Sequence, residues 1–143
     1  MSNSSSATTP DTTAPSAPGT LTSSAVSSTQ IDLSWGPATD DVGVTGYRVE
    51  RCTGASCSNF AQIATPTGTS YSDTGLTVAT SYRYRVRAVD AANNLGAFSN
   101  ISSATTPDTA PPSAPGVLTS SAVSSTQIDL SWGAATDDVG VTG

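Results

Sequence analysis

The chain has 143 residues, enough for one ordinary domain with some excess, and its hydrophobic content of 36% is too low for a membrane protein. Eleven acidic residues stand against five arginines, with no lysine and no histidine, so the formal charge is −6. This acidity argues against nucleic acid and anionic membranes as partners, and the lack of histidine removes the usual general base and the commonest metal ligand.

Short segments with alternating apolar and polar residues follow one another from residue 15 to residue 106. The first distinct one covers residues 31–35, the next residues 47–50, and the clearest covers residues 82–88, where arginines alternate with apolar side chains. Weaker strands are expected near Leu21 and at residues 60–64, 70–72 and 98–104. No segment of ten or more residues has helical periodicity, so the pattern predicts an all-β sandwich or barrel.

A long internal repeat sets the organisation of the chain. Residues 15–46 return 97 positions later as residues 112–143, and only two of the 32 positions differ. The register extends upstream, because residues 5–12 match residues 102–109. We therefore expect the chain to cross one full repeat of a longer tandem array and to stop inside the next, with both ends as cuts.

Two cysteines, Cys52 and Cys57, are the only ones in the chain. Their spacing is not C-x-x-C, and no histidine is present to complete the four ligands of a zinc site. We favour a local disulfide over two free thiols, and a disulfide implies an oxidising, extracellular location.

Several motifs in the chain occur together in one known family. They are Pro18 with Leu21, Ile31-Asp32-Leu33-Ser34-Trp35, Gly46-Tyr47-Arg48-Val49, and Leu76 followed by Tyr82-Arg83-Tyr84-Arg85-Val86-Arg87-Ala88. In this order they resemble the fibronectin type III domain, whose tryptophan lies on the second strand, whereas antibody-like domains carry it on the third. Residues 38–47 and 86–94 resemble most the bacterial members found in secreted chitinases, cellulases and large surface proteins.

The resemblance implies an immunoglobulin-like β-sandwich of seven strands over residues 15–106. It also implies a tyrosine corner, in which the Tyr82 hydroxyl bonds to nearby backbone. Residues 1–14 are then the tail of a preceding repeat plus a linker, residues 107–114 a proline-rich linker, and residues 115–143 the truncated start of the next repeat. The expected core residues are Trp35, Tyr47, Leu76, Tyr82, Tyr84 and Trp132.

A polar cluster is expected at one end of this sandwich, where the loops after the second and sixth strands meet. It contains Asp40, Asp41, Asp90, Asn93 and Asn94. Calcium takes six to eight oxygen ligands and would accept such a set. Asp and Asn more often cap turns by bonding their own backbone, and no D-x-D-x-D-G loop is present. We therefore favour turn capping and expect neither a bound metal nor a cofactor.

All five arginines lie on two predicted strands that should be neighbours in one sheet. By parity Arg48, Arg83, Arg85 and Arg87 share the solvent face, and Arg51 should leave the sheet at the strand end. One interpretation is that these arginines form a contact stripe for an acidic partner or a neighbouring repeat. The other is that they form a solvated face that discourages aggregation, and we favour this second interpretation. Only Phe60 and Phe98 are candidate surface aromatics for stacking on sugars, so polysaccharide binding is possible but unsupported.

No catalytic arrangement is present, because the serines and aspartates have no base beside them and no G-x-S-x-G or phosphate-binding loop occurs. The leading hypothesis is a non-catalytic spacer module of a secreted or cell-surface tandem-repeat protein, with neighbouring repeats as partners. The alternatives are a weak carbohydrate-binding module or a self-assembling stalk. In the stalk, residues 1–9 of one chain would complement the apolar side chains of Ile128, Leu130 and Trp132 of another, head to tail.

Overall fold

The computed structural model describes residues 4–143, which fall into two compact units. The first, here called the N-terminal domain, ends at Pro107, and the second, here called the C-terminal unit, is Asp108–Gly143. Among the described residues there is no helix, so the prediction of an all-β fold is confirmed. No element in this part of the chain is a helix long and apolar enough to cross a membrane.

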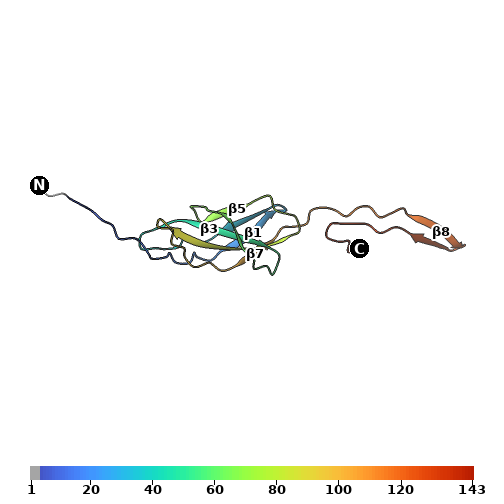
Figure 1. The fold of residues 1–143 in the computed structure, drawn as a ribbon. Coiled ribbons are helices and arrows are strands. Elements are labelled where there is room, and N and C mark those ends of the chain that lie inside the picture. Colours follow the sequence, from blue (N-terminus) through green and yellow to red (C-terminus); the bar gives the residue numbers. More distant parts are fainter. Residues whose placement is uncertain (1–3) are drawn as a thin grey trace. The chain divides into compact units, whose positions relative to one another are not determined.

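The N-terminal domain is a sandwich of two antiparallel sheets, which confirms the predicted seven-stranded fold (Figure 1). One sheet has the order β1-β2-β5 and the other the order β4-β3-β6-β7. The strands are β1 (Thr22–Ser27), β2 (Gln30–Ser34), β3 (Val44–Thr53), β4 (Ala61–Ala64), β5 (Ser70–Asp73), β6 (Ser81–Asp90) and β7 (Ser102–Thr105).

The period-two pattern determines which side chains enter the space between the sheets. In β6 every second residue, from Tyr82 to Asp90, is buried, and the residues between them are half-exposed. β2 contributes Ile31 and Leu33 in the same way, and β3 contributes Tyr47 and Val49. Burying these apolar side chains between two facing sheets supplies most of the driving force for folding.

Trp35 and two tyrosines organise the core around specific contacts. The ring of Trp35 meets the ring of Tyr47 edge-on, with centroids 5.5 Å apart. The Tyr47 hydroxyl accepts a hydrogen bond from the Ala38 N–H at 3.1 Å, and the Tyr82 hydroxyl accepts one from the Thr77 N–H at 3.0 Å. Leu76 and Tyr84 are also buried. The phenols of Tyr47 and Tyr82 therefore join apolar packing to a loop backbone, in keeping with the need of buried hydroxyls for a partner.

Cys52 and Cys57 form a disulfide that closes the turn after β3. Cys52 is buried at the end of the strand, and the Arg83 guanidinium donates a hydrogen bond to the Cys57 carbonyl. The sequence prediction of a local disulfide is confirmed.

The C-terminal unit contains one hairpin, β8 (Thr119–Ser124) and β9 (Gln127–Ser131), coloured orange to red in Figure 1. Its register, from Thr119 opposite Ser131 to Ser124 opposite Gln127, repeats that of β1 and β2, including the irregularity before the turn. The assignment of Trp132 to a core is wrong, because 63% of its surface is exposed. Within Asp108–Gly143 no second sheet faces the hairpin, which leaves most of this side chain exposed.

Candidate functional site

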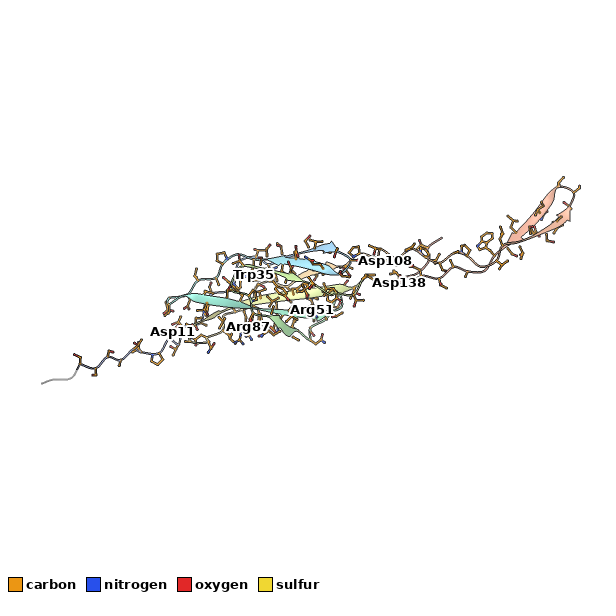
Figure 2. The ribbon with its side chains drawn as sticks, turned by 90° about the horizontal axis from the view of Figure 1, so that it is seen from above. Asp11, Trp35, Arg51, Arg87, Asp108 and Asp138 are labelled. Carbon is orange, nitrogen blue, oxygen red and sulfur yellow. A yellow bond between two sulfur atoms is a disulfide. The ribbon has the colours of Figure 1, made fainter. Side chains whose placement is uncertain are left out.

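Three aspartates converge at one end of the N-terminal domain. A carboxylate oxygen of each of Asp11, Asp40 and Asp90 lies within 4.8 Å of the others. Asp40 comes from the loop between β2 and β3, and Asp90 ends β6. Asp11 comes from the N-terminal segment, at the point where that segment reaches the sandwich (Figure 2). The two loops thus come together as predicted, and Asp11 from the linker lies beside them.

Each of the three aspartates caps a turn of its own backbone. The Asp40 carboxylate accepts hydrogen bonds from the N–H groups of Val42 and Gly43, at 3.2 and 3.0 Å. Asp90 Oδ1 accepts from the N–H groups of Ala92 and Asn94, at 3.0 and 2.8 Å. Such capping is the ordinary use of aspartate in loops. The three carboxylates each place one oxygen within reach of the others, whereas calcium takes six to eight oxygen ligands.

The N-terminal segment is fixed against the loop after β6 by the side chain of Asn94. Its Nδ2 lies 3.0 Å from the carbonyl oxygen of Asp11, 3.3 Å from that of Thr13 and 2.8 Å from Asp90 Oδ2, so its two N–H groups are shared among three acceptors. Gly96 allows the close approach, since a Cβ at this position would lie 2.6 Å from the Pro15 carbonyl oxygen. The linker is therefore part of the domain surface before the first strand begins.

The charges in this cluster repel one another. The Thr13 N–H lowers the pKa of Asp11, but burial and the carboxylates of Asp90 and Asp41 outweigh it and hold this pKa above its usual value. For Asp90, burial raises the pKa, whereas hydrogen bonds from Asn94 and Ala92 outweigh it and lower this pKa. Asp11 Oδ2 and Asp40 Oδ1 are buried without a hydrogen-bond partner. The proximity of the carboxylates therefore disfavours the charged form of Asp11 and not that of Asp90.

We expect Asp11→Asn to raise the melting temperature at pH 7. An acid with a raised pKa in the folded state lowers stability as the pH rises through that pKa, and its cost vanishes below the ordinary value of 3.8. The gain should therefore disappear at pH 3, as thermal melting followed by circular dichroism would measure. Asp129→Asn, which removes the same charge from an exposed site, is the control and should change nothing. An equal gain at pH 3 would contradict the repulsion argument.

Two members of the predicted cluster have other roles. Asp41 lies outside the group of three carboxylates and acts only through its charge on Asp11. Asn93 adopts φ 65° and closes the turn, where its N–H donates to the Asp90 carbonyl at 3.1 Å. Sequence reasoning missed Asp11, although its place in the repeat gave a signal. Asp108, its counterpart, lies beside Asp137 and Asp138 in the C-terminal unit (Figure 2).

Three of the four arginines of the predicted stripe lie against two phenylalanine rings on the outer face of the larger sheet. The Arg85 guanidinium lies 4.4 Å from the ring centroid of Phe60 and 3.9 Å from that of Phe98. Arg87 lies 4.6 Å from Phe98, and Arg83 6.0 Å from Phe60. Arg85 also pairs with Glu50 at 3.2 Å, and Arg48 stands opposite Arg87. A guanidinium group therefore lies against each phenylalanine ring, and a sugar would compete with it for that face of the ring.

Arg51 does not leave the sheet at the strand end, as its position suggested, but turns between the sheets. Its Nη1 donates to both carboxylate oxygens of Asp73 at 2.9 Å, and the Tyr84 hydroxyl donates to Asp73 Oδ2 at 2.9 Å. Burial, together with the bond to Asp73, raises the pKa of Tyr84. These three residues, here called the inter-sheet triad, join β3 and β6 of one sheet to β5 of the other.

Comparisons with known proteins agree with this geometry. The family model for the fibronectin type III domain matches residues 16–105. The chain is 47% identical over 139 residues to Chitinase A1 of Niallia circulans, covering 93% of this chain and 19% of that protein. It is 45% identical over 140 residues to Exoglucanase B of Cellulomonas fimi, covering 95% and 12%. The chain thus spans less than a fifth of either relative.

A solved structure of titin domains A168–A170 has the same fold. It superimposes with a TM-score of 0.59 and 28% identity, covering 66% of this chain and 33% of that one.

Proposed function

Because the chain belongs to the fibronectin type III family, we propose that it is a non-catalytic spacer in an extracellular tandem-repeat protein, where it sets the position of neighbouring domains. The observation that carries the proposal is the difference in activity between its relatives. One is a chitinase and another an exoglucanase, yet both contain a segment nearly half identical to this chain. A segment shared by enzymes with different substrates is a poor candidate for choosing either substrate.

The contacts of the N-terminal domain support a mechanical role. Its buried polar groups serve the fold, as the inter-sheet triad does, and the aspartates cap turns. Asn94 fixes the linker to the sandwich, which reduces the freedom of the joint. The proline-containing linkers at residues 10–18 and 107–115 favour an extended, semi-stiff backbone. A stiff spacer of this kind raises the effective concentration of the domains it joins without binding anything itself.

The disulfide supports an extracellular location, since cytosolic thiols are kept reduced. The close repeat of residues 15–46 supports neighbouring repeats as the principal partners.

The experiment that separates the spacer from a carbohydrate-binding module is depletion by insoluble polysaccharide. The chain is mixed with chitin or with cellulose, and the fraction left in the supernatant is measured. We expect essentially all of it to stay in solution, because guanidinium groups already lie over both phenylalanine rings. Retention that Phe98→Ala abolishes, while Val26→Ala leaves it intact, would replace the spacer with a binding module.

A further inference from the structure

The outer face of the larger sheet holds one pair of arginines that no carboxylate neutralises. Arg48 of β3 stands directly opposite Arg87 of β6. The strands of this sheet contain one outward-facing acid, Glu50, and it already pairs with Arg85 at 3.2 Å. Within residues 4–143, neither Arg48 nor Arg87 forms an ion pair. Like charges directly opposite on neighbouring strands repel, so a carboxylate bound over the pair would remove an unfavourable contact.

An aromatic ring borders this pair of arginines. The Arg87 guanidinium lies 4.6 Å from the ring centroid of Phe98, which belongs to the loop between β6 and β7. Arg48, Arg87 and Phe98 are all half-buried, so part of each side chain reaches solvent, and we call them the arginine–phenylalanine patch. The patch offers two guanidinium groups to a carboxylate and an apolar surface beside them. A ligand that matches it therefore carries an acid next to an apolar side chain.

The domain itself carries such a combination at the tip of the loop between β2 and β3. Asp41 is exposed, and Val42 is 66% exposed, more than any other large apolar side chain described in the N-terminal domain. The Asp40 carboxylate fixes this loop from within by accepting bonds from the N–H groups of Val42 and Gly43. A tip that is already held in one conformation loses little freedom on binding.

We propose that the Asp41–Val42 tip of one copy of this chain docks on the arginine–phenylalanine patch of another copy. The Asp41 carboxylate binds between the guanidinium groups of Arg48 and Arg87, and Val42 lies against the ring of Phe98. Tip and patch are different surfaces, so the contact is heterologous and each copy can bind one neighbour through its tip and another through its patch.

The distribution of charge favours a second copy over a long anionic polymer. Acidic side chains converge at one end of the domain, where Asp11, Asp40 and Asp90 meet, and the whole chain has a formal charge of −6. Charges farther apart than about 8 Å are largely screened at physiological salt, so a small loop tip interacts mainly with the patch. An extended polyanion would reach beyond the patch and meet the carboxylates as well.

Repetition of the tip compensates for the weakness of a single contact. The ion pairs of one contact are exposed, and exposed ion pairs contribute little. The same tip sequence returns 97 positions later as Asp138–Val139, so a tandem array presents it once per repeat. Several weak contacts between two arrays act together and hold far more tightly than one. The proposal is independent of the spacer role, because a spacer joins its neighbours whether or not copies adhere.

The test follows the nitrogen-15-labelled full chain by NMR between roughly 10 μM and 1 mM at low salt, the range in which weak contacts form. We expect the backbone resonances of Asp41 and Val42 and the Nε–H resonances of Arg48 and Arg87 to move together as the concentration rises. They should return to their dilute positions at about 1 M salt, where the screening length is about 3 Å. Arginine resonances that do not depend on concentration would overturn the proposal. Association through the exposed side chains of the C-terminal hairpin would overturn it too, and would move the Trp132 indole resonance and survive high salt.

Variants with matched charge separate the patch from the general effect of net charge. Arg48→Gln and Ser24→Glu each make the chain one unit more negative, but Ser24 is exposed on β1 of the other sheet. Arg48→Gln should weaken self-association by at least roughly threefold and Ser24→Glu much less. Equal losses would contradict the proposed face.

A variant of the loop tips tests the other half of the contact. Asp41→Asn combined with Asp138→Asn makes the chain less acidic, so weaker overall repulsion should strengthen non-specific association. The docking account predicts the reverse, a loss of at least roughly threefold, and unchanged or stronger association would refute it.

A final arm asks whether a polyanion is the true occupant. Polygalacturonate, a polymer of carboxylate-bearing sugars, is added to the chain at a concentration where copies do not associate. We expect the resonances of Arg48 and Arg87 to stay in place. Movement of both at low polymer concentration, with Asp41 unaffected, would replace a second copy with an anionic polysaccharide.

Discussion

Trp35→Ala is expected to lower the free energy of unfolding of the N-terminal domain by about 3–5 kcal/mol, as large-to-small aromatic substitutions in a core do. Trp35 is 5% exposed, and its ring lies edge-on to the ring of Tyr47. The bond from the Ala38 N–H to the Tyr47 hydroxyl limits how far the Tyr47 ring can move into the vacated space. Small domains are stable by about 5–15 kcal/mol, so the loss is a large share of the total stability.

The chain supplies its own control for this substitution. Trp132→Ala removes the same side chain from the same local sequence, where it is exposed, and should change stability by no more than about 0.5 kcal/mol. Urea unfolding followed by far-ultraviolet circular dichroism measures both. Trp35→Phe keeps an aromatic ring and removes an indole N–H that is buried without a partner, so it should cost much less than alanine. Equal effects of the two tryptophan-to-alanine changes would contradict the core assignment.

Asp73→Ala is expected to lower the free energy of unfolding by about 1–3 kcal/mol, because it leaves two polar groups without their partner. The substitution leaves the Arg51 guanidinium without its buried counter-charge and the Tyr84 hydroxyl without its acceptor. The hydroxyl of the fully buried Tyr84 loses its acceptor outright, whereas water partly solvates the Arg51 side chain, which is 29% exposed. Urea unfolding at neutral pH would measure the loss.

A double variant tests whether the cost of Asp73→Ala comes from leaving the Arg51 guanidinium without a counter-charge. Arg51→Met combined with Asp73→Leu fills the same space with apolar side chains and should be more stable than Asp73→Ala alone. Asp129→Ala, which removes an exposed aspartate from the C-terminal unit, should have no measurable effect. A double variant no better than Asp73→Ala would show that the cost does not come from an unpaired charge.

The strands were predictable because their alternation is local and regular. In β6, arginines separate the buried side chains from Tyr82 to Ala88, and this pattern alone assigns the two faces. The same parity placed Arg48, Arg83, Arg85 and Arg87 together. Parity also placed Arg51 on the inner face. From that position near the strand end, the sequence alone suggested that its side chain would turn out into solvent. Asp73 shares the inward parity of Tyr71, so two opposite charges facing inward on opposing sheets were the available signal for the inter-sheet triad.

The acidic cluster was only partly predictable, because it depends on how the chain folds back on itself. Asp40 and Asp90 follow strands whose ends meet at one end of a sandwich, so the topology brings them together. Asp11 precedes the first strand, and its position depends on Asn94, a long-range contact without a sequence pattern. Trp132 was misassigned for a related reason, since its sequence is that of a core residue and only the absence of a facing sheet within its unit exposes it.

The spacer proposal is tested most directly inside a related enzyme. In Chitinase A1 of Niallia circulans, the segment that matches this chain is replaced either by residues 15–107 of this chain or by a glycine–serine linker of equal length. Such a linker is a coil whose end-to-end distance varies widely, with a root-mean-square value of about 5–6 Å times the square root of the residue number. Hydrolysis rates are then measured on insoluble chitin and on a soluble substrate. We expect this chain to preserve both rates and the flexible linker to lower only the rate on insoluble chitin. Equal rates with both replacements on insoluble chitin would contradict the claim that a folded spacer matters.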